Sequence, residues 1–132
     1  LDSKNIATMS EIILKKILRQ ELGFKGLIIS DDLEMKAITD HFGESEAPRL
    51  ALQAGCDLLI YRSEGAAIKA YEALVHALEK KTLQAETVIA AATRSQELKK
   101  KVLFPYADAV WDNAKVVLAS PAHQQTVEMV QA

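Results

Sequence analysis

The sequence predicts an α/β fold in which parallel β/α units follow one another along the chain. Two short apolar runs, Leu27–Ser30 and Asp57–Tyr61, each come shortly after a glycine that can close a helix. Runs of this length are typical of strands that are buried on both faces of a parallel sheet. Amphipathic stretches separate and follow them, and such alternation of helices and strands is typical of parallel β/α units.

A helix is expected before the first strand. Thr8 or Ser10 can cap this helix, which runs to about Leu22 and is closed by Gly23. Apolar residues at helical spacing form one face of the segment, and basic residues fall mostly on the other face.

The connection between the two strands is expected to hold a second helix. Asp31–Gly43 is predicted to be a long loop with one helical turn around Met35–Ile38. The helix then begins near Ser45, because Pro48 is tolerated only in a first turn, and it ends at Gly55. A long loop at the end of a strand is a common place for a functional site.

Two further helices are expected after the second strand. The loop Arg62–Gly65 leads into a helix over residues 66–80. A break at 81–83 precedes a helix over residues 86–102, which Pro105 stops.

The number of strands limits what these elements can form. Only two strands are convincing, and two parallel strands expose both edges of their sheet. A barrel of eight β/α units needs about 250 residues. We therefore expect residues 1–104 to be the last quarter of a TIM (β/α)8 barrel, its C-terminal portion. Residues 105–132 are expected to be a loose C-terminal tail, with one short helix that opens at Ser120-Pro121.

Composition excludes several classes of partner. The chain has 132 residues, of which 26% are charged, and a net charge of −2, which argues against nucleic acid. No apolar run approaches the roughly 18 residues of a membrane helix, so no membrane partner is expected. A single cysteine, Cys56, fits a cytoplasmic protein, and secretion is also compatible. The first residue is not methionine and no signal peptide is visible, so we expect the chain to begin inside a longer polypeptide.

Two adjacent carboxylates, Asp31 and Asp32, follow the first strand directly. In parallel α/β folds the chemistry lies where strands end at their carboxyl side. Position alone, however, fits an ordinary acidic loop that caps the following helical turn better than it fits a catalytic site.

The residues around this pair resemble a known signature. Ile17-Leu18-Arg19-Gln20-Glu21 and, four residues later, Gly26-Leu27-Ile28-Ile29-Ser30-Asp31 resemble the active-site signature of family 3 glycoside hydrolases. The wider segment 26–38 is similar to the β-N-acetylhexosaminidase branch, in which Ser-Asp-Asp-Leu-x-Met is typical. Residues 54–59 resemble the following strand of that barrel, and the similarity extends over about residues 3–104.

The resemblance implies roles for single residues. Asp31 is expected to be the catalytic nucleophile, with Asp32 and Met35 as substrate-binding residues. Asp32 could instead accept backbone N–H bonds or hold a basic neighbour, and Met35 could instead pack inside the loop. Glu34 departs from the family pattern, which usually has a small or amide residue there. No metal or other cofactor is expected.

The resemblance also implies a reaction. The complete enzyme would be a retaining, exo-acting hydrolase that removes terminal N-acetylglucosamine, a step of the kind used in peptidoglycan recycling. Its general acid/base would lie upstream of this chain, because the chain's histidines are in no such context; these are His41, His76 and His123. The partners expected are an N-acetylglucosaminide, the remaining N-terminal part of the barrel and a second copy of the chain. The chain alone is expected to be inactive.

Two other functions fit parts of the sequence. Leu27–Met35 also looks like the first strand of a response-regulator receiver, in which an acidic pair such as Asp31 and Asp32 binds magnesium. That family needs a phosphate-accepting aspartate after a later strand, where Tyr61 and Arg62 stand here. The other alternative is a non-catalytic remnant that binds sugar or pairs with a partner.

Overall fold

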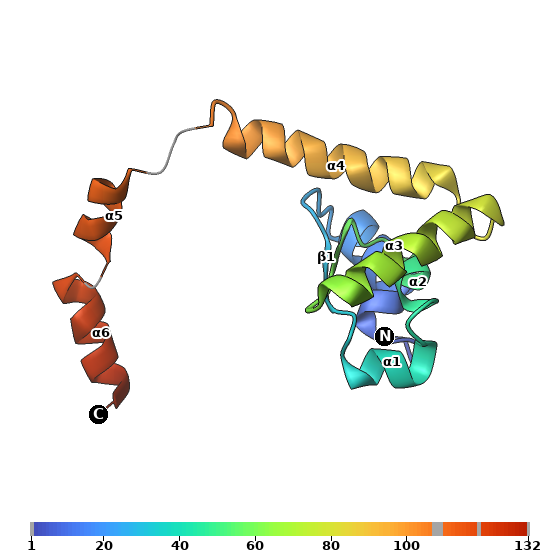
Figure 1. Ribbon diagram of the computed structural model, residues 1–132, viewed down its shortest axis with the longest axis horizontal. Helices are drawn as coiled ribbons and strands as arrows, with labels where there is room; N and C mark the ends of the chain where they lie inside the picture. Colours follow the sequence, from blue (N-terminus) through green and yellow to red (C-terminus); the bar gives the residue numbers. More distant parts are fainter. Residues whose placement is uncertain (1, 107–109, 119, 132) are drawn as a thin grey trace. The chain divides into compact units, whose positions relative to one another are not determined.

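Helices alternate with two short strands in the computed structural model, which describes residues 2–106, 110–118 and 120–131 (Figure 1). The chain separates into two compact units, residues 1–102 and residues 103–132. The first unit holds both strands and every residue of the acidic loop.

The first unit begins with the expected helix. A 3₁₀ turn, η1 (Ala7–Met9), leads into η2 (Ile12–Glu21). Ser10 caps η2 as predicted, because its Oγ accepts the Ile13 N–H at 3.2 Å. η2 is wound as a π-helix over its whole length, and at its end the Leu22 N–H donates to the Ile17 carbonyl five residues back. Gly23 closes it with a φ of 66°, a value that favours glycine.

The strands β1 (Ile29–Asp32) and β2 (Leu58–Ile60) pair in parallel, which confirms the predicted arrangement. The predicted bounds of β1, residues 27–30, are wrong by two residues. The reason is that the backbone just before β1 bonds to side chains: the Gly26 carbonyl accepts from Arg19 and the Ile28 N–H donates to Asp57. The acidic pair therefore forms the end of the strand itself.

A β-bulge lies within β1. Ile29 is opposite Leu58 and Asp32 is opposite Ile60, so three steps on β1 match two steps on β2. At this point the Ser30 side chain takes the place of a backbone acceptor, because its Oγ accepts the Ile60 N–H at 2.9 Å. Ser30 is buried, and the bulge is therefore fixed by an internal hydrogen bond.

The connection after β1 holds two helices. α1 (Lys36–Phe42) is longer than the single turn expected around Met35–Ile38. α2 (Ala47–Ala54) has Pro48 in its first turn and ends at Gly55, as predicted. Gly55 has a φ of 122°, in a region that side chains rarely adopt.

The remaining helices extend to the end of the described chain. α3 (Glu64–Glu79) and α4 (Ala85–Leu103) match the two helices expected after β2. In the second unit, α6 (Pro121–Gln131) opens at the predicted proline. The expectation that the tail holds only one helix is wrong, because α5 (Trp111–Val117) precedes it. Val116 and Val117 are β-branched and disfavour a helix, so the sequence pattern did not predict α5.

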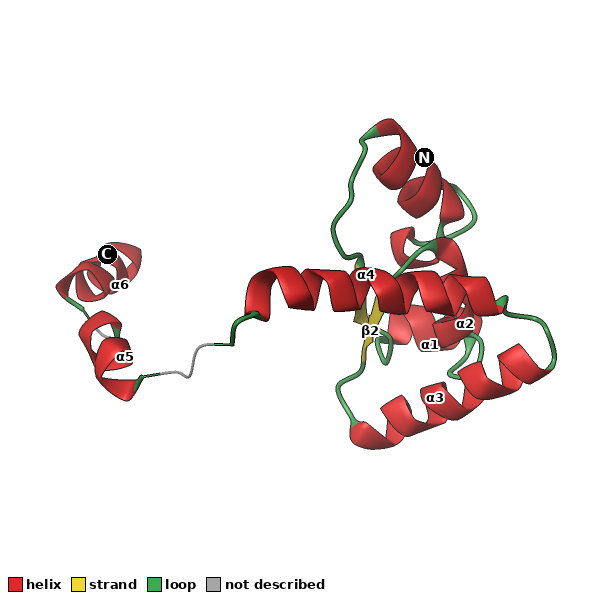
Figure 2. Ribbon diagram, turned by 90° about the horizontal axis from the view of Figure 1, so that it is seen from above, coloured by secondary structure: helices red, strands yellow, loops and turns green. Residues whose placement is uncertain are grey.

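Apolar packing covers one face of the strand pair. One buried cluster joins η2, α1 and α2 to Ile28 and Leu33, and a second joins α2, α3 and α4; Leu59 contacts both clusters. Figure 2 shows the short strands among these helices. The prediction that the strands are buried on both faces is wrong for this chain, since Ile29, Leu58 and Ile60 are 52%, 37% and 46% exposed. No helix in the described residues is long and apolar enough to cross a membrane.

Candidate active site at the carboxyl edge of the strands

The carboxyl ends of β1 and β2 meet at one edge, because the strands are parallel. The Leu33 N–H donates to the Ile60 carbonyl at 3.0 Å, which keeps the two chains paired just past the end of β1. Asp31, Asp32 and Glu34 leave from the first strand here, and Arg62 and Ser63 follow the second. This edge therefore gathers three carboxylates and one arginine on two short segments.

Asp31 is the most available of these carboxylates. Its side chain is exposed, and Oδ1 accepts the Asp32 N–H at 2.8 Å. Among residues 2–106, 110–118 and 120–131, no lysine, arginine or histidine forms an ion pair with it. The neighbouring Ser30 bond to β2 holds the backbone from which it projects. Asp31 thus offers a free oxygen from a fixed strand end.

Asp32 shapes the turn that follows. Its Oδ1 accepts the Glu34 N–H at 2.9 Å, and its carbonyl accepts the Met35 N–H at 3.2 Å. Of the two alternatives to substrate binding, acceptance of a loop N–H is the one observed. Neither aspartate caps α1, whose N-cap residue is Met35, and the Met35 side chain makes no capping hydrogen bond.

Met35 lies at the mouth of the same loop. The residue is 44% exposed, which leaves it accessible beside the acidic pair. A flexible apolar side chain beside Asp31 and Asp32 can contact the apolar face of a sugar or another part of the protein.

Glu34 joins the two segments of the edge. Its Oε2 accepts the Ser63 N–H and its Oε1 accepts the Ser63 Oγ–H, both at 2.7 Å. These hydrogen bonds lower the pKa of the Glu34 carboxyl, with a smaller contribution from the Arg62 charge. The sequence marks Glu34 only as a departure from the family pattern, and nothing in it indicates a partner 29 residues away.

Tyr61 contributes a buried hydroxyl below this edge. Its oxygen has no hydrogen-bond partner in the described part of the chain. Burial, followed by the charges of Glu34 and Asp32, raises the pKa of Tyr61 to about 12, so the hydroxyl stays protonated. It is a donor without an acceptor within reach.

The opposite, amino edge of the strands is held by Asp57. Its buried carboxylate pairs with Arg19 at 2.5 Å and Arg94 at 2.7 Å, and it accepts the Ile28 N–H at 2.8 Å. Arg19 also donates to the Phe24 and Gly26 carbonyls. This network ties η2 and α4 to both strands. Arg19 and Asp57 stand in the segments that carry the family resemblance, but no role was predicted for either.

The remaining polar candidates have no place in the site. Cys56 is buried, as predicted, and burial raises the pKa of its thiol to about 11. His41 is exposed on α1, and Lys99, Lys100 and Lys101 are exposed on α4. The described residues hold no group of three or more His, Cys, Asp or Glu side chains that could bind a metal ion.

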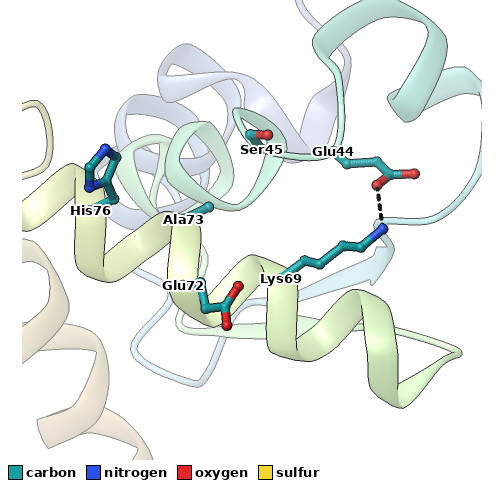
Figure 3. A pocket seen from close by; sticks show the side chains of 6 residues that line it. All are labelled: Glu44, Ser45, Lys69, Glu72, Ala73 and His76. Carbon is teal, nitrogen blue, oxygen red and sulfur yellow. Dashed lines mark ion pairs between the residues drawn. The ribbon is translucent and has the colours of Figure 1, made fainter.

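A hollow of about 470 Å³ lies elsewhere, between the loop before α2 and the helix α3. Its charged lining includes the exposed ion pair between Lys69 Nζ and Glu44 Oε2, at 3.5 Å, with Glu72 and His76 on the same helix as Lys69 (Figure 3). Asp31, Asp32 and Met35 do not line it. It is separate from the carboxyl edge and carries none of the expected chemistry.

Comparison with known proteins agrees with the signature. Residues 1–97 match the family model described as the glycosyl hydrolase family 3 N terminal domain. The chain is 48% identical over 54 residues to a β-hexosaminidase of Neisseria gonorrhoeae, a match that covers 41% of this chain and 15% of that protein. It is 32% identical over 126 residues to β-hexosaminidase A of Pseudoalteromonas piscicida, covering 90% of this chain and 21% of that protein.

A solved structure gives the same result. The family 3 β-N-acetylglucosaminidase of Paenibacillus sp. FPU-7 superposes with a TM-score of 0.74 at 31% identity, over 82% of this chain and 21% of that one. The chain therefore spans about a fifth or less of the length of each of these relatives. The resemblance inferred from the signature is confirmed: this chain belongs to glycoside hydrolase family 3, and its curated relatives are β-hexosaminidases.

Proposed function

We propose that this chain is the nucleophile-bearing part of a retaining, exo-acting β-N-acetylhexosaminidase, with Asp31 as the nucleophile. The observation that carries the proposal is the state of Asp31: an exposed carboxylate without a cationic partner, at the carboxyl end of a strand whose bulge is pinned by Ser30. A nucleophilic carboxylate must be ionised and must be held in line with the anomeric carbon. Of the three carboxylates at this edge, Asp31 is the exposed one that projects directly from the strand held by the Ser30 bond.

The substrate class is inferred from the relatives. They are β-hexosaminidases and a β-N-acetylglucosaminidase, so a terminal N-acetylglucosamine is the sugar we expect the complete enzyme to remove. Asp32 and Met35 would contact this sugar, since they flank Asp31 on the same turn and Met35 is exposed. No step of glycosyl transfer to a carboxylate requires a metal ion.

The general acid is expected to come from outside this chain. A retaining hydrolase needs a protonated carboxyl or imidazole beside the leaving oxygen, with a pKa near the working pH. Glu34 is the obvious neighbour, but both of its oxygens accept hydrogen bonds and its pKa is lowered, which is the wrong direction for an acid. An upstream part of the barrel would supply the acid instead.

The exposed face of the strand pair supports the barrel interpretation. Ile29, Leu58 and Ile60 are apolar and open on the face that the helices leave free. In a (β/α)8 barrel the helices cover the outer face and the other strands enclose the inner one. We infer that the first unit is a part of such a barrel and that the open face is turned towards its interior.

Family membership favours this function over a receiver domain. The receiver hypothesis also needs a phosphate-accepting aspartate after β2, where Tyr61, Arg62 and Ser63 stand. A non-catalytic remnant is the competing possibility for the chain by itself, because it has a nucleophile without an acid.

The test is a substitution in the complete enzyme that contains this segment. Asp31→Asn should abolish hydrolysis of a chromogenic N-acetylglucosaminide while leaving the circular dichroism spectrum unchanged, because an amide cannot attack the anomeric carbon. Asp40→Asn, an equally conservative change on exposed α1, is the matched control and should keep full activity. Activity in Asp31→Asn comparable to that of the control would overturn the assignment.

A further inference from the structure

We propose that Glu34 is a positioning residue that holds the nucleophile turn to the loop after β2 by binding Ser63. The inference depends on the proposed role of Asp31 and adds a residue that the family pattern does not provide. It starts from geometry: Glu34 is two residues beyond β1, and Ser63 is three residues beyond β2. Both oxygens of the Glu34 carboxylate are used in this single contact.

The contact completes the cap of a helix. Ser63 is the N-cap residue of α3, and its Oγ accepts the Ala66 N–H at 3.3 Å. In a capping box the third helical residue is Glu or Gln, and its side chain accepts the N-cap N–H in return. Here that third residue is Ala66, which has no acceptor. Glu34 takes its place from the neighbouring segment and accepts the Ser63 N–H.

The contact also fixes the turn that carries Asp31. The chain from Asp31 to Glu34 is anchored at its start by the strand ladder and the Ser30 bond to Ile60. Asp32 bonds to the Glu34 N–H inside the turn, and Glu34 then bonds to Ser63 at its end. Without Glu34 the turn would have no side-chain hydrogen bond to the β2 segment beyond Ser30. The Leu33 N–H would still donate to the Ile60 carbonyl, but the turn beyond it would lose its bond to Ser63, and the orientation of the Asp31 carboxylate would be fixed less closely.

Three ionisable groups lie near Glu34. Asp32 is on the same turn and accepts the Glu34 N–H, and Tyr61 and Arg62 are on the segment after β2. Arg62 is the only cation of the three, and it favours the charged form of Glu34. Hydrogen bonds to a carboxylate are the strong kind, so the charged form of Glu34 is the one that holds Ser63.

Three variants of the complete enzyme test the proposal, with Glu72→Ala on the exposed face of α3 as the matched control. Misplacement of a reacting group by a remote change can cost up to about 100-fold in rate. Glu34→Ala should therefore lower kcat roughly 10- to 100-fold with little change in KM, and Glu34→Gln should recover part of that loss because its amide oxygen still accepts from Ser63. Ser63→Ala should also lower kcat, and adding it to Glu34→Ala should cost little more, because the two residues act through one contact.

The outcomes separate the two proposals. If Asp31→Asn is inactive but Glu34→Ala keeps the kcat of the Glu72→Ala control, the positioning role is wrong and the nucleophile assignment stands. If Asp31→Asn remains active, the proposed function fails whatever Glu34 does. If Glu34→Ala and Ser63→Ala raise KM as much as they lower kcat, or if their losses simply add, Glu34 acts in substrate binding or stability and the positioning role is overturned. Thermal melting of each variant identifies any loss that comes from unfolding alone.

Discussion

At the residue scale, the buried carboxylate of Asp57 contributes more to the stability of the fold than the exposed carboxylates of the site. Its carboxylate is fully buried and is neutralised by Arg19 and Arg94. A buried pair stabilises little relative to an apolar alternative, but removing one partner leaves an uncompensated charge. Asp57 also accepts the Ile28 N–H, so its loss would release the start of β1.

Asp57→Asn should therefore lower the free energy of unfolding by about 3–5 kcal/mol, the usual cost of breaking a buried ion pair. Urea denaturation followed by circular dichroism measures it. The control is Glu11→Gln, which breaks the exposed pair with Lys15 at 3.3 Å and should cost only about 0.3–0.5 kcal/mol. Equal effects of the two substitutions would mean that the Asp57 network is not a structural anchor.

The buried environment of Cys56 leads to a second prediction at the residue scale. It is 2% exposed, and burial raises its pKa from 9.0 to about 11. The folded state therefore keeps the thiol proton where the unfolded state loses it. The stabilisation that this provides is complete below pH 9 and is lost as the pH rises from 9 towards 11.

Cys56 should accordingly fail to react with an aromatic disulfide reagent at pH 8 in the folded chain and react fully in urea. Raising the pH from 8 to 10 should lower the urea midpoint of the native chain more than that of Cys56→Ala. Rapid labelling of the folded chain at pH 8 would show that the thiol is accessible, and the buried assignment would then be wrong.

At the scale of elements, three glycines with positive φ end helices, Gly23, Gly43 and Gly55, and the last of them also lies close to a neighbouring helix. Gly55 has a φ of 122°, and a Cβ there would lie 3.3 Å from Lys15 Cγ and 3.5 Å from Leu14 Cβ. The backbone conformation therefore strains any side chain at this position, and the Lys15 side chain would have to shift slightly to make room for it. Gly65, in the first turn of α3, has open space around it.

Gly55→Ala should destabilise the chain by about 1–3 kcal/mol, the usual cost of a strained backbone conformation. Gly65→Ala is the matched control and should stabilise it by about 0.4–1 kcal/mol, because alanine restricts the unfolded chain and suits a helix. Thermal melts of the two variants should move in opposite directions. A Gly55→Ala variant as stable as the parent would contradict the close approach of α2 and η2.

The elements also show what a sequence can and cannot reveal. Local signals placed most of them correctly: Ser10 and Gly23 at the ends of η2, and Pro48 and Gly55 at the ends of α2. The bounds of β1 were wrong because Arg19 and Asp57 take the hydrogen bonds of its predicted start. Asp57 is 29 residues from Ile28, and Ser63 is 29 residues from Glu34, so neither of these contacts follows from a local pattern.

For the whole molecule, the open face and edges of the strand pair predict association. Ile29, Leu58 and Ile60 are exposed together on a sheet of two strands, whose outer edges have no partner in the described chain. Exposed strand edges and apolar faces of this kind promote pairing with other chains. Burial on both faces was predicted because the two runs are short and almost continuously apolar, which is typical of strands inside a parallel sheet.

The isolated 132-residue chain should therefore self-associate at micromolar concentration and should not hydrolyse a chromogenic N-acetylglucosaminide. The absence of a general acid should by itself lower the rate of hydrolysis by about 10²–10⁴-fold. Light scattering and an activity assay on the same sample measure the two properties. A stable monomer would mean that less of the fold is missing than proposed, and measurable turnover would mean that a general acid lies within this chain.

The assignment of Asp31 is tested most directly by trapping the covalent intermediate. A 5-fluoro analogue of an N-acetylglucosaminide, which keeps the 2-acetamido group, should leave its sugar on one carboxylate of the complete enzyme, because retaining hydrolysis passes through a glycosyl-enzyme ester. Peptide mapping by mass spectrometry should find that sugar on Asp31. Its presence on Asp32, Glu34 or any other carboxylate would contradict the account.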